Sequence, residues 1–194
     1  MVGITNMNHW AGSMNDAIVV YPDGVGVGAT SCWSIPGMVN VGQCFYDVGN
    51  DDVGFINALI DEMIRRYSID ESRIYAAGFS NGGMMALNLA CRLSHRIAAF
   101  GVVSGGPMVN LVAVGSLTVN SWQCPWGARQ GKVPVMFIHG KSDTITPHQH
   151  APDTVSWLAA QHGYTQLLCP LVAIGCPWVR PRVQDACDIV KVVT

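Results

Sequence analysis

The sequence predicts a three-layer α/β fold, in which helices cover both faces of a mostly parallel sheet. Short apolar runs of strand length alternate along the chain with longer stretches whose apolar residues recur at helical spacing. Within Arg73–Ala86, one such strand passes directly into a helix through a glycine-flanked turn. Strands joined by right-handed helical crossovers run parallel, so their carboxyl ends should meet at one edge of the sheet.

The first elements are an apolar strand and a capped helix. Ala17–Tyr21 is expected to be a buried strand, and Pro22-Asp23-Gly24 forms the turn that ends it. The glycine-rich segment that continues to Gly49 reads as a long loop. Asp51 or Asp52 should cap the helix that follows. That helix carries a stripe of apolar residues, namely Val53, Ile56, Leu59, Ile60, Met63, Ile64 and Tyr67.

The rest of the chain continues the alternation. Residues 68–72 are expected to form the turn that leads into the strand before Ser80. Residues 107–132 show no helical or strand periodicity of their apolar residues, and we expect them to form a surface excursion over the sheet edge. The other predicted elements are a helix from near Asn81 to about Arg92, a strand at Ala98–Val103, a strand at Val133–His139, a helix from about Asp153 to His162 and a last strand at Asp188–Val193.

Length and composition indicate one soluble domain over residues 1–194. The chain is 49% hydrophobic and 12% charged, which is typical of a packed core and not of disorder. A formal net charge of −2 offers no basic surface for nucleic acid, and no run of Lys or Arg indicates a membrane surface. The longest apolar runs are too short for a transmembrane helix. We therefore expect no nucleic-acid partner and no membrane partner.

Seven cysteines are many for a chain of this length. They form no Cys-x-x-Cys pair, and no histidine partners them at zinc spacing, so we expect no metal site and no cofactor. Scattered cysteines favour an exported protein with disulfides, and the alternative is a few buried thiols in a cytosolic core. Met1–Trp10 has neither the basic start nor the apolar stretch of a signal peptide. The cysteines are Cys32, Cys44, Cys91, Cys124, Cys169, Cys176 and Cys187.

The Gly-x-Ser-x-Gly turn has the form of a nucleophile elbow, and the alternative is a plain glycine-rich turn. Gly78 and Gly82 flank Ser80, where side chains would collide on a sharp strand-to-helix bend. The bend would expose the Ser80 hydroxyl. The helix that begins near Asn81 would direct its first N–H groups to the same place, so the Asn81 N–H is the expected oxyanion donor. We find no second donor in the sequence before residue 17.

A serine nucleophile needs a base, normally a histidine oriented by a carboxylate. Asp143 fits the acid because it follows the apolar strand at Val133–His139, although a helix cap or a solvated loop residue would also explain it. Asp153 is the next candidate, but its expected place at a helix start is better explained by capping.

The base stays unknown, because none of the six histidines occupies the usual position after the acid on a later loop. His148, His150 and His162 follow Asp143 and are weak candidates. The other three fit less well: His9 and His95 precede the acid, and His139 ends a strand and reads as structural.

Four segments carry a family resemblance: Tyr21-Pro22-Asp23-Gly24, Asp51-Asp52-Val53-Gly54-Phe55-Ile56, Gly78-Phe79-Ser80-Asn81-Gly82-Gly83-Met84 and His139-Gly140-Lys141-Ser142-Asp143. In this order and spacing they resemble the polyhydroxybutyrate depolymerase-like esterases, which include the feruloyl and acetyl xylan esterases of carbohydrate esterase family 1. The resemblance covers about Asn8 to Tyr164. It implies an α/β-hydrolase fold, secretion, disulfides and serine ester hydrolysis, with Ser80 as nucleophile, Asn81 as oxyanion donor and Asp143 as triad acid.

Two features of that family have no counterpart in the sequence. Its members usually carry a His-Gly oxyanion loop after an opening strand, and a catalytic histidine in a glycine-rich loop after a strand like Ile189–Val193. The chain starts after the first position and stops before the second, so we expect it to be incomplete at both ends. Thr165–Arg182 also matches the family pattern poorly.

The leading interpretation is therefore a serine carboxylic-ester hydrolase that acts on a small or polymeric ester, of the feruloyl esterase, acetyl xylan esterase or polyhydroxybutyrate depolymerase type, and is secreted. Trp33, Trp122 and Trp126 would suit a hydroxycinnamoyl or polyester substrate, although core packing explains tryptophans equally well. A catalytically defective or non-catalytic member that lacks its base is the alternative from another class. A prolyl-oligopeptidase-like peptidase fits less well, because such enzymes normally carry a large extra domain.

Overall fold

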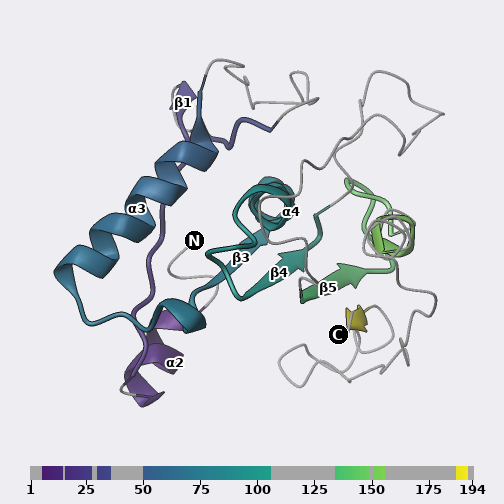
Figure 1. Cartoon of the computed structure of the whole chain (residues 1–194). Coiled ribbons are helices and arrows are strands. Elements are labelled where there is room, and N and C mark those ends of the chain that lie inside the picture. Colours follow the sequence, from purple (N-terminus) through teal and green to yellow (C-terminus); the bar gives the residue numbers. More distant parts are fainter. Residues whose placement is uncertain are drawn as a thin grey trace.

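The centre of the molecule is a four-stranded sheet flanked by helices (Figure 1). The computed structural model describes residues 6–14, 16–27, 30–35, 50–105, 134–148, 151–155 and 187–191. The sheet has the order β3 (Tyr75–Phe79), β4 (Ala99–Val103), β5 (Val135–Gly140) and β6 (Cys187–Lys191). β3, β4 and β5 are parallel, and β6 is antiparallel to β5. The expected α/β class with a mostly parallel sheet is confirmed.

The strand register brings the carboxyl ends of the three parallel strands to one edge of the sheet. Phe79 lies opposite Val103, and Val103 lies opposite Ile138. The hydrogen bonding continues one residue past two of the strands: Ser80 N–H donates to the Val103 carbonyl, and Ser104 N–H donates to the Ile138 carbonyl, both at 2.8 Å. Residues that follow β3, β4 and β5 are therefore neighbours at this edge.

Helix α4 (Asn81–Arg92) begins immediately after β3 and packs on β3 and β4. The helix carries buried apolar residues on nearly every side, as expected of a helix in the interior of an α/β fold. Its buried members are Met85, Ala86, Leu87, Leu89, Ala90 and Cys91, and they form one cluster with Phe100, Val102, Val135 and Phe137 of the sheet. This burial fixes the position of the helix, and with it the position of its first turn.

Helix α3 (Asp52–Arg66) packs beside α4 and buries Ile56 and Ile60. Asp51 caps it, because the Asp51 carboxylate accepts the Gly54 N–H at 2.8 Å. Of the two predicted caps, Asp51 is therefore correct. Asp52 instead turns inward and is only 5% exposed, which matters for the site described below.

The prediction of a buried strand at Ala17–Tyr21 is wrong. Residues 17–21 form neither helix nor strand, and Ile18 and Val20 are 52% and 42% exposed. A strand is stable only when a neighbour accepts and donates its backbone hydrogen bonds. Among the described residues, β3 pairs with β4 alone and lies at the edge of the sheet, so residues 17–21 have no strand beside them.

A short helix and a small hairpin were not predicted. Helix α2 (Met7–Met14) precedes the exposed apolar segment. Within the predicted long loop, β1 (Gly26–Val27) and β2 (Thr30–Ser31) pair as a small antiparallel hairpin. A 3₁₀ turn, η1 (Glu71–Arg73), lies between α3 and β3 where a turn was expected.

The remaining predictions are met in part. β4 and β5 confirm the strands predicted at Ala98–Val103 and Val133–His139, and β6 confirms the last strand. Residues 151–155 are helical, so Asp153 lies inside that helix and not at its start. The excursion at 107–132 lies outside the described residues, as does the end of the helix predicted to reach His162.

In the part of the chain that the structure describes, no helix combines the length and the apolar character needed to cross a bilayer.

Candidate active site

The predicted elbow has the geometry that its glycines imply. Ser80 adopts φ 54° and ψ −119° between β3 and α4, a backbone conformation that is uncommon for a residue with a side chain. A Cβ atom added to Gly78 would lie 2.0 Å from the Gly82 carbonyl oxygen, so only glycine fits there. The chain thus turns sharply from strand to helix at Ser80, as the Gly-x-Ser-x-Gly pattern predicts.

Ser80 lies directly at the N-terminus of α4. Its side chain makes no capping hydrogen bond to the helix. The Asn81 N–H is the first of the helix, and the aligned peptide dipoles of α4 favour negative charge at this end. An oxyanion formed beside Ser80 would therefore meet a favourable electrostatic field.

Asp143 lies at the same edge of the sheet, in the loop after β5. Its Oδ1 atom accepts the Ile145 N–H at 3.0 Å and the Thr146 N–H at 2.9 Å. Burial opposes ionisation of this carboxyl. The N–H donors of Thr146 and Ile145, the nearby His139 and the Ser104 hydroxyl outweigh burial and lower the pKa of Asp143 below its ordinary value. The group is therefore held as a carboxylate.

His139 anchors this loop through a buried hydrogen bond. The residue is 1% exposed, and its Nε2–H donates to the Thr146 carbonyl at 2.7 Å. The same nitrogen lies 3.5 Å from Oδ2 of Asp143. Nδ1 of His139 is buried without a hydrogen-bond partner, and among the described residues no hydrogen bond joins the His139 ring to Ser80.

The structure brings Ser80, Asn81 and Asp143 to one edge of the sheet, but it does not supply the base. Adjacent strands lie about 4.8 Å apart, so β3 and β5, with β4 between them, are separated by roughly 10 Å. An imidazole could bridge that gap. Among the described residues, however, no hydrogen bond joins the Ser80 side chain to a histidine.

Each histidine can be placed or set aside. The His148 ring packs edge-on against His139 with 5.9 Å between ring centroids. His9 contacts Trp10 in the exposed helix α2, and His95 is exposed after α4. His150 and His162, the other two candidates for the base, lie outside the described residues.

Two polar side chains near the elbow were not recognised from the sequence, and both hold the segment 32–35. The Asn81 side chain accepts the Trp33 N–H at 2.7 Å and donates to the Trp33 carbonyl at 3.3 Å. Asp52 accepts the Ser34 N–H at 2.6 Å. For Asp52, the only signal in the sequence is that a second acidic residue directly follows the helix cap, because capping requires just one. The sequence carries no signal for the contacts of the Asn81 side chain.

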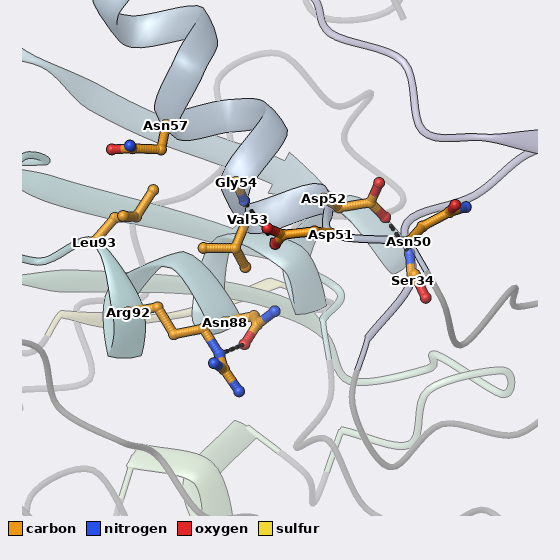
Figure 2. A pocket seen from close by; sticks show the side chains of 10 residues that line it. All are labelled: Ser34, Asn50, Asp51, Asp52, Val53, Gly54, Asn57, Asn88, Arg92 and Leu93. Atoms are coloured by element: carbon orange, nitrogen blue, oxygen red, sulfur yellow. Dashed lines mark hydrogen bonds between the residues drawn. The ribbon is translucent and has the colours of Figure 1, made fainter.

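A cavity of about 380 Å³ lies behind this segment, between the start of α3 and the end of α4. Figure 2 shows Ser34 and Asp52 joined by a hydrogen bond on one side of it and Asn88 and Arg92 on the other. Neither Ser80 nor Asp143 lines this cavity. It is therefore separate from the candidate catalytic residues.

No cluster of metal-ligating side chains occurs among the residues that the structure describes. Trp122 and Trp126 lie outside those residues, so Trp33 is the one predicted substrate-facing tryptophan whose surroundings can be described.

Residues 49–167 match the family described as Phospholipase/Carboxylesterase. The chain belongs to this family. The matched residues contain the elbow and Asp143, whereas Trp33 precedes them. The predicted α/β-hydrolase fold is thereby confirmed.

Curated relatives of the chain include esterases and a depolymerase. A bifunctional acetylxylan esterase/xylanase of Neocallimastix patriciarum is 31% identical over 134 residues, covering 68% of this chain and 15% of that protein. Feruloyl esterase B of Piromyces equi is 41% identical over 88 residues, covering 45% and 15%. Poly(3-hydroxyalkanoate) depolymerase C of Paucimonas lemoignei is 28% identical over 173 residues, covering 80% and 40%. The chain spans less than half the length of each, and the predicted similarity to these enzyme types is confirmed.

Proposed function

We propose that the protein is a serine carboxylic-ester hydrolase that works through an acyl-enzyme at Ser80. The observation that carries the proposal is the conformation of Ser80, a residue with a side chain held at φ 54° on a turn where only glycine fits at Gly78. Strained backbone of this kind costs on the order of 1–3 kcal/mol and persists where a function needs it. Membership of a carboxylesterase family supports the same chemistry.

In the proposed reaction the Ser80 Oγ atom attacks the ester carbonyl carbon while a histidine accepts the hydroxyl proton. The tetrahedral oxyanion would accept a hydrogen bond from the Asn81 N–H at the start of α4. Collapse of the intermediate breaks the bond to the alcohol, which leaves with the proton from the histidine. Water then hydrolyses the acyl-enzyme by the same steps and restores Ser80. Asp143, held ionised, would orient the histidine and stabilise its charged form.

We assign the histidine to a residue that follows Asp143, and His148, His150 and His162 are the candidates within the chain. A substrate of the feruloyl, acetyl xylan or polyhydroxyalkanoate ester type is supported by the names of the relatives. We propose an extracellular protein, which the disulfides at Cys32 and Cys91 support. We further propose that the chain forms one domain with neither nucleic-acid nor membrane partners.

Labelling of the folded chain with a fluorophosphonate tests the proposal, because the probe reacts with a serine hydroxyl activated by a neighbouring base. We expect an adduct on Ser80, mapped by mass spectrometry and absent in Ser80→Ala. His148→Ala, His150→Ala and His162→Ala identify the base, since one of them should abolish labelling while circular dichroism shows an unchanged fold.

Ser68→Ala serves as the control, because it removes an exposed serine hydroxyl between α3 and β3, away from the carboxyl ends of the strands. It should keep the adduct. Absence of an adduct on a chain shown to be folded would favour the alternative, a non-catalytic member of the family that lacks its base.

A further inference from the structure

We propose that Trp33 and Phe55 form an aromatic surface beside Ser80 that binds the ring of an aromatic ester. The inference rests on the proposed function and deepens it, because it names the part of the substrate that this chain would select. We call the two residues the aromatic pair.

The first step is the position of Trp33 relative to the nucleophile. The Asn81 side chain brackets the main chain of Trp33 with two hydrogen bonds, accepting its N–H at 2.7 Å and donating to its carbonyl at 3.3 Å. Asn81 directly follows Ser80. The Trp33 main chain is therefore bound one residue away from the candidate nucleophile, although 48 positions separate Trp33 from Asn81 in sequence.

The second step is the rigidity of the segment that presents Trp33. The next N–H, that of Ser34, donates at 2.6 Å to the buried carboxylate of Asp52, which α3 supplies. Cys32 and Ile35, on either side, are buried at 7% and 3% exposure. Helices α3 and α4 thus fix this segment from two directions, so a ligand would not need to order it on binding.

The third step is the surface that the pair offers. The rings of Trp33 and Phe55 stack at 25° with 6.4 Å between centroids. Phe55 is on the first turn of α3 and is 44% exposed, whereas its neighbour Ile56 is buried in the core. A flat apolar ring can stack on such a pair, and aromatic contacts of this kind are favourable beyond their buried area.

The aromatic pair would favour one of the ester types that the relatives are named for over the others. A feruloyl ester carries an aromatic ring on its acyl side, whereas an acetyl or hydroxyalkanoyl ester carries none. Only the first has a ring that can stack on the aromatic pair. We therefore infer that the site prefers aromatic esters to aliphatic esters of similar size.

The experiment compares kcat/KM for methyl cinnamate and methyl hexanoate in the wild-type chain and in Trp33→Ala, Trp33→Phe and Phe55→Ala. We expect the cinnamate-to-hexanoate ratio to fall by about tenfold in Trp33→Ala and to recover in part in Trp33→Phe, because a stacked ring in a binding site contributes roughly that factor. Tyr67→Ala is the matched control: it removes a half-exposed aromatic from the other end of α3, roughly 18 Å away, and should leave the ratio unchanged.

Equal losses on both esters, or an unchanged ratio in Trp33→Ala and Phe55→Ala, would overturn the inference. A second measurement does not need catalysis: binding of ethyl cinnamate to Ser80→Ala, followed by NMR shifts of the tryptophan side chains. Binding that disappears in Ser80→Ala with Trp33→Ala supports the aromatic pair even if the wild-type chain hydrolyses neither ester, a result that would count against the proposed function alone. No binding to Ser80→Ala would overturn the aromatic pair.

Discussion

The buried Nε2–H of His139 donates a 2.7 Å hydrogen bond to the carbonyl oxygen of Thr146. This bond closes the loop that carries Asp143 onto the end of β5. The Thr146 side of the contact is itself only 8% exposed, so water cannot readily replace the donor. The position of Asp143 thus depends on a histidine that does not take part in the proposed proton transfer.

We expect His139→Ala to lower the free energy of unfolding by about 1–3 kcal/mol, because it removes the donor to a buried carbonyl and leaves a void. Urea denaturation followed by circular dichroism would measure the change. His95→Ala alters an exposed histidine and should stay within about 0.5 kcal/mol of the wild-type chain. Similar effects of the two substitutions would contradict the anchoring role.

Asp143 should make stability depend on pH at the acid end. Its pKa is lowered in the folded chain, whereas an unfolded aspartate titrates near about 3.9. The stabilisation is therefore complete above that unfolded value and is lost as the pH falls through the lower folded pKa. The excess stability of the wild-type chain over Asp143→Asn should shrink as the pH drops from about 5 to 2. Unfolding free energies of both chains measured across this pH range test the prediction. A difference between them that does not change with pH would contradict it.

The elbow should tolerate no side chain before Ser80. Gly78→Ala places a methyl group 2.0 Å from the Gly82 carbonyl oxygen, and the backbone must shift to relieve the contact. We expect a loss of at least about 1–3 kcal/mol, the usual cost of overpacking, seen as a lower Tm. Gly12→Ala in helix α2 is the control, since nothing lies within 4 Å of its added methyl group and alanine favours a helix. A Tm that Gly78→Ala leaves unchanged would show that the turn is less tight than described.

The two neighbouring acidic residues at the start of α3 should behave differently. Asp52→Ala removes the acceptor of the Ser34 N–H, so the Ser34 amide should exchange with deuterium faster and the chain should lose about 1–3 kcal/mol. Asp51→Ala removes only the cap and should cost about 1 kcal/mol without changing exchange at Ser34. Hydrogen exchange with mass spectrometry distinguishes the two variants. Equal exchange rates of the Ser34 amide in Asp52→Ala and Asp51→Ala would contradict the role of Asp52.

The sequence was informative where local pattern alone determines structure. Helix α3, the strand–turn–helix at Ser80 and the strands β4 and β5 follow from apolar periodicity and from glycines that a sharp turn requires. The strand predicted at Ala17–Tyr21 failed because apolar character cannot show whether a neighbouring strand is present.

The site was predictable only in part for a related reason. Ser80 and Asp143 each follow a strand and could be found by their position along the chain. The contacts of Asn81 with Trp33, and of Asp52 with Ser34, join residues far apart in sequence and leave no periodic signal. The same holds for the base, whose identity depends on which loop reaches the gap between β3 and β5.

Ser80 and Ser104 both have left-handed backbone, with φ values of 54° and 47°, at the ends of neighbouring strands. Glycine would adopt either conformation at less cost. A library of variants selected only for thermal resistance should therefore accumulate glycine at these two positions. Such a selection would discard the hydroxyl that bonds to Asp143 along with the one at the elbow. Variants selected for heat tolerance alone would thus lose first the Ser80 and Ser104 hydroxyls, which give this edge of the sheet its candidate chemistry.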